Sequence, residues 1–163
     1  MNLRGAASGL LIAALVVSGA AFCSSCRSAD NGQNGGMLVI RDADSGAVYG
    51  KWALDEPGEF AIEFMHSVNQ SPVRESFRTE DGLIRPVSVR FSSFGAGMRS
   101  DLEEGQILTQ NGDYLFISGF TVSFKELFYI IRTVSDHLLL INDYTISLRE
   151  LCGKTTHIAI RVE

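Results

Sequence analysis

The feature of this sequence that most constrains its fold is a period of two that runs from residue 37 to residue 163. Short runs rich in Val, Ile, Phe, Tyr and Thr recur about every ten residues, and turn-forming groups such as Asp-Ser-Gly, Glu-Pro-Gly and Glu-Asp-Gly separate them. Regularly spaced short strands with turn signals between them are typical of antiparallel sandwiches and barrels. The sequence therefore predicts a single all-β domain over residues 37–163, an antiparallel sandwich or barrel-like fold.

The apolar runs predict eleven strands. They are expected near residues 37–42, 47–54, 59–67, 73–80, 83–92, 106–110, 113–118, 127–134, 137–142, 144–150 and 156–162. The stretch 120–131 also fits the apolar face of a helix, and a short helix there would leave the fold class unchanged. Hairpins are expected at Asn111-Gly112 and Asn142-Asp143. The second hairpin pairs Ile141 with Tyr144, Leu139 with Ile146, and His137 with Leu148.

The first 26 residues predict an export or membrane-anchor segment. Arg4 precedes an uncharged stretch with an apolar centre, and a run of small residues follows it, which is the order of an export signal. Three outcomes stay open: cleavage after Ala20 or Ala21, lipid attachment at a cysteine, or retention as a membrane anchor. Cys26 fits a relaxed lipoprotein box better than Cys23, so we expect the lipid at Cys26. Residues 27–36 predict a flexible tether.

Composition narrows the choice of function. The 14 basic residues against 19 acidic ones give a formal net charge of −5, which provides no basic surface for nucleic acid. The 3 cysteines cannot build a disulfide scaffold, and Cys152 is expected to be a small buried core residue. Because disulfides cannot stabilise the fold, we expect an ordinary apolar core to do so. The N-terminal segment further predicts an extracytoplasmic protein that is attached to a bacterial membrane.

A candidate polar pair lies on the strands at 59–67 and 73–80. A four-residue connection from Asn69 to Pro72 would place His66 opposite Glu75 on the apolar face. A carboxylate removed from water needs a hydrogen-bond donor, so the pair is either a structural clamp, a ligand contact, or a catalytic or metal site. Ser67 points to the opposite face, so a His66–Ser67 catalytic dyad is geometrically poor. His157 has the wrong parity for the core and is expected in solvent.

A second candidate site follows the strand at 83–92. Gly95 and Gly97 would let successive backbone N–H groups turn inward as an anion-binding nest, with Ser92, Ser93 and Arg99 as further donors. The alternative is a tight bend whose phenylalanines fill the core. The glycines and lysine of a phosphate loop are missing, which argues against nucleotide binding.

These residues together resemble the bacterial family designated domain of unknown function eighteen-fifty. The resemblance spans essentially residues 37–163, and one departure is Arg99, where the family usually has proline. The family resembles a membrane-tethered, extracytoplasmic all-β module, and its genes often lie beside those of TAXI-type TRAP transporters, which import small organic anions. The resemblance is carried by Leu38-Val39-Ile40, Asp42, Gly46, His66-Ser67-Val68, Pro72-Val73, Glu75, the run from Ser92 to Gly97, and His137-Leu138.

The expected function is therefore a non-enzymatic binding or accessory module that is tethered to the membrane and serves a TRAP-type uptake system for small organic anions. Its expected partner is a TRAP transporter subunit or a small organic anion. The expected ligand-binding residues are His66, Ser67, Glu75, Ser92, Ser93, Gly95, Gly97, Arg99 and His137. No cofactor or metal is expected. The alternative is an envelope enzyme, a hydrolase or a metal-dependent enzyme, with His66 and Glu75 as base and orienting group.

Overall fold

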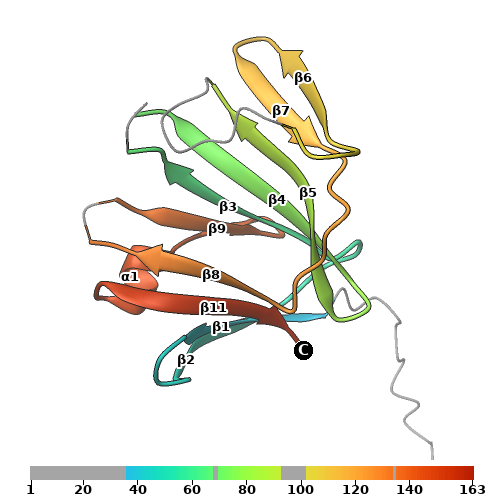
Figure 1. The fold of residues 1–163 in the computed structure, drawn as a ribbon. Helices are drawn as coiled ribbons and strands as arrows, with labels where there is room; N and C mark the ends of the chain where they lie inside the picture. Colours follow the sequence, from blue (N-terminus) through green and yellow to red (C-terminus); the bar gives the residue numbers. More distant parts are fainter. Residues whose placement is uncertain (1–35, 68–69, 93–101, 134) are drawn as a thin grey trace, which may run out of the picture. The chain divides into compact units, whose positions relative to one another are not determined.

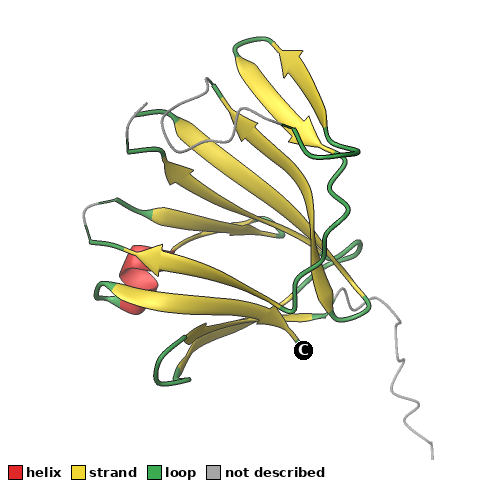
Figure 2. Ribbon diagram, in the orientation of Figure 1, coloured by secondary structure: helices red, strands yellow, loops and turns green. Residues whose placement is uncertain are grey.

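The computed structural model describes residues 36–67, 70–92, 102–133 and 135–163 of the chain. Almost every described element is a strand, and all the strand pairs are antiparallel (Figure 1 and Figure 2). The predicted all-β sandwich is therefore confirmed. The elements are β1 (Met37–Asp42), β2 (Val48–Ala53), β3 (Glu59–Met65), β4 (Pro72–Glu80), β5 (Leu83–Phe91), β6 (Ile107–Asn111), β7 (Tyr114–Ser118), β8 (Glu126–Ile131), β9 (His137–Ile141), β10 (Tyr144–Ser147), α1 (Leu148–Cys152) and β11 (Thr156–Val162).

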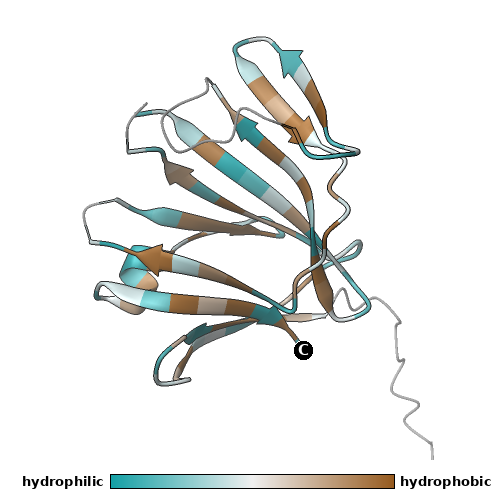
Figure 3. Ribbon diagram, in the orientation of Figure 1, coloured by the Kyte–Doolittle hydropathy of each residue, from teal (hydrophilic) through white to brown (hydrophobic). Residues whose placement is uncertain are grey.

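The strands form two sheets of unequal width. The narrower sheet has four strands in the order β2-β1-β11-β8, and the wider one has seven in the order β10-β9-β3-β4-β5-β7-β6. Apolar and polar residues alternate along most strands, as Figure 3 shows. The apolar faces of the two sheets meet, which is how a half-buried strand with a period of two removes its hydrophobic side from water.

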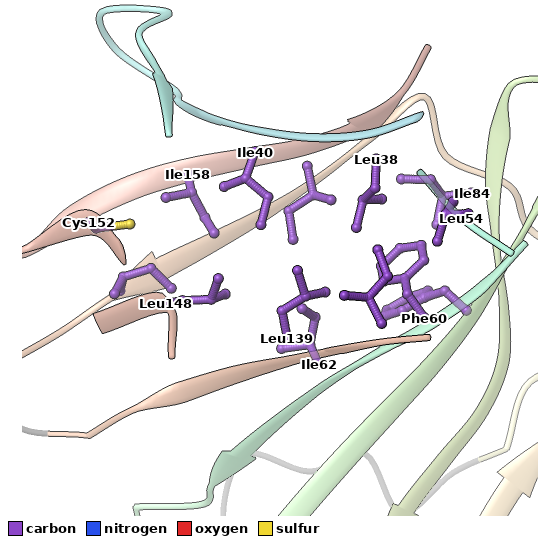
Figure 4. Close-up of a cluster of buried hydrophobic side chains, with 14 residues drawn as sticks. Leu38, Ile40, Leu54, Phe60, Ile62, Ile84, Leu139, Leu148, Cys152 and Ile158 are labelled. Atoms are coloured by element: carbon purple, nitrogen blue, oxygen red, sulfur yellow. The ribbon is translucent and has the colours of Figure 1, made fainter. Parts of the chain in front are cut away.

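The core lies between the narrower sheet and one side of the wider sheet (Figure 4). It draws on β1 and β11 from one layer and on β3, β4 and β9 from the other. Phe60 and Phe77 stack within it, with their ring centroids 5.2 Å apart. Cys152 lies in this core as a free, buried thiol, which confirms its prediction as a small apolar residue.

Two-residue turns join several neighbouring strands. Asp81 and Gly82 link β4 to β5 with φ values of 52° and 71°, and Asn142 begins the β9–β10 turn with a φ of 50°. Gly, Asn and Asp are the residues that tolerate this left-handed backbone, and it matches the twist of a hairpin. The predicted pairs Ile141–Tyr144 and Leu139–Ile146 are confirmed. The β6–β7 hairpin predicted at Asn111-Gly112 is confirmed as well.

The turn between β1 and β2 is fixed by Asp42, which is only 4% exposed. Its Oδ1 accepts hydrogen bonds from the backbone N–H groups of Asp44 (3.1 Å) and Ser45 (2.8 Å). Its Oδ2 accepts hydrogen bonds from the hydroxyls of Tyr49 (2.9 Å) and Thr156 (2.8 Å). The pKa of this carboxyl lies well below its usual range, because it accepts hydrogen bonds from the Ser45 backbone and then from the Thr156 and Tyr49 hydroxyls. Asp42 therefore joins the β1–β2 turn to the first residue of β11.

The prediction of a strand over 144–150 is wrong in its second half, because β10 ends at Ser147 and helix α1 begins at Leu148. The expected pairing of His137 with Leu148 is consequently absent. Ser147 caps the helix by accepting a hydrogen bond from the Glu150 backbone N–H at 3.0 Å. Gly153 ends the helix in the left-handed conformation, with a φ of 67°. The spacing of serine, glutamate and glycine was a helix signal that the alternation of apolar residues obscured.

The predicted register between β3 and β4 is also wrong. Glu75 lies opposite Ile62 rather than opposite His66, a shift of four residues. The connection is longer than expected, because β3 ends at Met65 and β4 starts at its partner Pro72. The shift is an even number, so every side chain keeps its predicted face. It also lets Phe60 pair with Phe77, whereas the predicted register would have set Phe60 opposite the β4–β5 turn.

The helical alternative for 120–131 is not adopted. Residues 126–131 form β8, and residues 119–125 run extended from β7 to β8. Phe124 forms an isolated antiparallel bridge with Ile84 of β5, in which both N–H···O distances are 2.8 Å. This segment therefore joins the two sheets at the place where the candidate site lies.

Candidate functional site

A row of six side chains crosses the inner face of the wider sheet, one from each of six neighbouring strands. Reading from β9 to β6, they are Leu139, Ile62, Glu75, Val89, Ile117 and Leu108. Five of the six are aliphatic, and the exception is Glu75 on β4. Burying a carboxyl in such a row costs free energy unless the carboxyl is hydrogen-bonded or ion-paired. The role of Glu75 therefore depends on the groups around it.

A cavity of about 560 Å³ lies against this row. Nine of its thirteen described lining residues are apolar, and they come from β3, β4, β5, β7 and the segment 119–125. A second cavity of about 320 Å³ adjoins it, and Glu75 lines both. The four polar lining residues of the larger cavity are His66, Glu75, Glu103 and Gln106.

The cavity exists because the two sheets differ in width. The narrower sheet ends at β8, while the wider sheet continues through β5 and β7 to β6, beyond β8 in Figure 1. The segment 119–125 covers part of the remaining face and contributes Phe120, Val122 and Phe124 to the cavity wall. Gly119 begins this segment with a φ of 81°, and a Cβ atom there would lie 2.2 Å from the Gly105 carbonyl oxygen. The 103–106 turn therefore lies directly against the start of this segment.

Glu75 is hydrogen-bonded across the two sheets. The Tyr129 hydroxyl on β8 donates to Glu75 Oε2 at 2.6 Å, so the bond joins an edge strand of the narrower sheet to the wider sheet. Within the described part of the chain, Glu75 has this hydrogen bond and no other, and no salt bridge. A carboxylate offers about four lone-pair sites, so most of its capacity to accept hydrogen bonds remains available.

The environment of this pair changes how both groups titrate. Burial raises the pKa of Glu75 above its ordinary value, and the Tyr129 hydrogen bond opposes that rise. Burial, and then the neighbouring Glu75 carboxyl, raises the pKa of Tyr129 well above its ordinary value. Tyr129 is therefore a neutral donor at physiological pH.

His137 packs next to this pair. Its ring stacks on Phe64 at a centroid distance of 5.1 Å and meets Tyr129 edge-on at 6.1 Å. Burial lowers the pKa of His137, and the Asp136 carboxylate partly offsets that effect. Its Nδ1 atom is buried and has no hydrogen-bond partner among the described residues. The imidazole thus serves as an aromatic wall behind Tyr129 and is not itself a lining residue of the larger cavity.

The structure places the predicted site residues as follows. His66 and Glu75 both line the larger cavity, although they are not cross-strand partners. Ser67 is exposed, Ser92 is half-buried, and neither lines the cavity in the described structure. The remaining predicted residues, Ser93, Gly95, Gly97, Arg99 and the lipid site Cys26, lie outside the described residues. His157 is 58% exposed in its side chain, as predicted.

Sequence reasoning missed three polar contributors. Tyr129 lies in the stretch whose helix-or-strand assignment was ambiguous, and strand parity with Leu127 and Ile131 would have placed it on the inner face. Glu103 and Gln106 form a small turn in which the Glu103 backbone N–H donates to Gln106 Oε1 at 2.9 Å. No periodicity marks that turn, so only the folded structure shows that it reaches the cavity.

The expected imidazole–carboxylate pair is not formed, because Tyr129 is the hydrogen-bond partner of Glu75. Among the described residues, no group of three or more His, Cys, Asp or Glu side chains is arranged to hold a metal ion. In the same part of the chain, no helix has the length and hydrophobicity needed to cross a membrane.

Comparison with known proteins gives one match. No curated protein and no solved structure is significantly similar to the chain. A family model described as a domain of unknown function, DUF1850, matches residues 60–148. This range runs from β3 to the start of α1 and includes Glu75 and Tyr129. Since the match spans more than half of the sequence, the chain belongs to the DUF1850 family.

Proposed function

We propose that this protein is a non-enzymatic binding module, which takes a small and largely apolar molecule into the cavity beside Glu75. The single observation that carries the proposal is the cavity itself. Its volume of about 560 Å³ lies within the range of small-molecule sites, which is roughly 300–1,000 Å³. Such sites combine a mainly apolar wall with a few polar groups that orient the ligand, and this cavity has both.

The position of the cavity in the fold supports the same function. It lies beyond β8, outside the cluster of buried side chains that holds the two sheets together. A ligand there would remove apolar surface from water, and each Å² removed contributes about 25 cal/mol. Binding therefore requires no rearrangement of the core.

A neutral apolar dye tests the proposal. N-phenyl-1-naphthylamine fluoresces when it enters an apolar site, and we expect saturable fluorescence with the wild-type domain. Val89→Trp fills the cavity from β5 and should weaken dye binding at least tenfold. Val87→Trp is the matched control, because Val87 lies on the same strand and lines neither the larger nor the adjoining cavity. Equal binding by both variants, or no binding by the wild type, would refute the proposal.

We also propose that the module is extracytoplasmic and is held at a bacterial membrane through its N-terminal segment, with lipid on Cys26. Metabolic labelling with radioactive palmitate tests this. Cys26→Ser should abolish the label, while Cys23→Ser should retain it. Loss of the label in Cys23→Ser alone would show that the lipid is attached to Cys23 instead.

The proposed partnership with a TRAP-type uptake system rests on the family resemblance. Cross-linking of this protein to the transporter subunits tests it.

A further inference from the structure

We propose that the cavity selects a cationic amphiphile, an alkylammonium ion whose head group meets Glu75 and whose tail lies along the apolar wall. This inference rests on the proposed binding function and adds the class of ligand. It departs from the expectation of a small organic anion. The observations that carry it are the charges of the lining, the incomplete hydrogen bonding of Glu75, and the aromatic wall around it.

The described lining of the larger cavity is acidic. Its two ionisable carboxyls are Glu75 and Glu103, and His66 is the third ionisable side chain. Neither lysine nor arginine occurs among the lining residues that the structure describes. Walls of low dielectric concentrate the field of a half-buried carboxylate, so Glu75 repels an anionic ligand and attracts a cationic one.

Among the described residues, no cationic side chain forms a salt bridge with Glu75. Its one hydrogen bond in the described structure comes from Tyr129, a neutral donor, and leaves Oε1 unpartnered. A half-buried carboxylate without a cation is left with a desolvation cost. An ammonium group has three N–H donors and one positive charge, so it supplies what this carboxylate lacks. A ligand carboxylate would instead add a second negative charge.

The wall around Glu75 suits the rest of such a ligand. Phe64, Phe91, Phe120 and Phe124 line the larger cavity and come from three different parts of the chain. Aromatic faces attract a neighbouring cation and also accept an alkyl tail. The adjoining cavity of about 320 Å³ also touches Glu75, which gives a tail a second direction in which to extend.

Three ligands with the same tail and different heads test the inference. Octylammonium, octan-1-ol and octanoate are each titrated against the dye-loaded wild-type domain at pH 7 and low salt, and displacement is measured. We expect octylammonium to displace the dye at a concentration at least tenfold below that of octanoate, with octan-1-ol between them. A carboxylate that binds as well as the ammonium would overturn the inference and leave the binding function intact.

Variants then assign the preference to one carboxyl. Glu75→Gln keeps the shape and removes the charge, so it should shrink the ammonium-to-carboxylate preference at least fivefold while the dye still binds. Glu80→Gln is the control, because Glu80 lies on the same strand and lines neither cavity at Glu75. Tyr129→Phe provides a second variant that perturbs Glu75 without changing the net charge, and it should preserve the preference for ammonium. An unchanged preference in Glu75→Gln, or an equal loss in Glu80→Gln, refutes the assignment. Failure of the dye and of all three ligands to bind would instead refute the proposed function.

Discussion

Replacing Tyr129 with phenylalanine tests the bond between the two sheets directly. The substitution removes one hydroxyl and leaves the ring in place against His137. Glu75 then loses its one hydrogen bond in the described structure, the 2.6 Å contact from β8. A hydrogen bond to a charged group contributes about 1.5–3 kcal/mol. Both side chains are half-buried rather than fully buried, so we expect a loss of about 1.5–2 kcal/mol in the free energy of unfolding at pH 7.

The loss should depend on pH, and its sign follows from the pKa of Glu75. Burial raises that pKa in the folded state, so the folded protein holds a proton that the unfolded chain has released. The contribution of Glu75 to stability is therefore fully present below its ordinary pKa and is lost as pH rises through the raised value. The Tyr129 hydrogen bond opposes this rise in pKa because it favours the ionised carboxyl. Removing the hydroxyl should therefore destabilise the folded protein most at pH values where Glu75 is ionised. Near pH 4 the cost should fall to about 0.5–1.5 kcal/mol, the range of a neutral hydrogen bond.

Urea unfolding followed by tryptophan fluorescence measures both values. The matched control is Tyr144→Phe, because Tyr144 is 68% exposed. A double-mutant cycle with Glu75→Gln isolates the coupling between the two residues. If Tyr129→Phe costs no more than Tyr144→Phe, or if its cost is the same at pH 4 and pH 7, the account of this bond is wrong.

Two further substitutions test other parts of the fold. Gly119→Ala should cost more than Gly112→Ala in urea unfolding, because both glycines have positive φ but only the first has a carbonyl oxygen within 2.2 Å of the added Cβ. Equal losses in the free energy of unfolding would show that the 103–106 turn moves aside without an energetic cost. Asp42→Asn should lower the melting temperature at pH 7, with Asp44→Asn as the exposed control. Because the folded pKa of Asp42 is depressed, its contribution is present above the ordinary pKa and is lost as pH falls, so the difference between these variants should narrow in acid.

The sequence carried most of the sheet architecture, because alternation and turn residues are local signals. The bounds predicted for β1 and β11 match the structure, and so do the two predicted pairs nearest the Asn142-Asp143 turn, Ile141–Tyr144 and Leu139–Ile146. The β3–β4 register was out of reach because it depends on how many residues the connection uses, and composition does not reveal that number. The error left each side chain on its predicted face of the sheet, which is why His66 and Glu75 still line one cavity.

The candidate site was less accessible to sequence reasoning than the fold. Glu75 stood out because it interrupts an apolar face, but its partner Tyr129 is 54 residues away in the chain. Their contact depends on how the narrower sheet lies over the wider one, which no local pattern encodes. For the same reason, nothing in the sequence indicated that residues 119–125 would form part of a cavity wall.

Because the two sheets differ in width, the residues that stabilise the fold are largely different from those that line the cavity. The residues that hold the layers together lie under β1 and β11, whereas the side chains facing the hollow come largely from the last strands of the wider sheet and one connecting segment. Replacing Phe120 or Val122 with another side chain would thus reshape the hollow and leave the contacts within the core cluster in place.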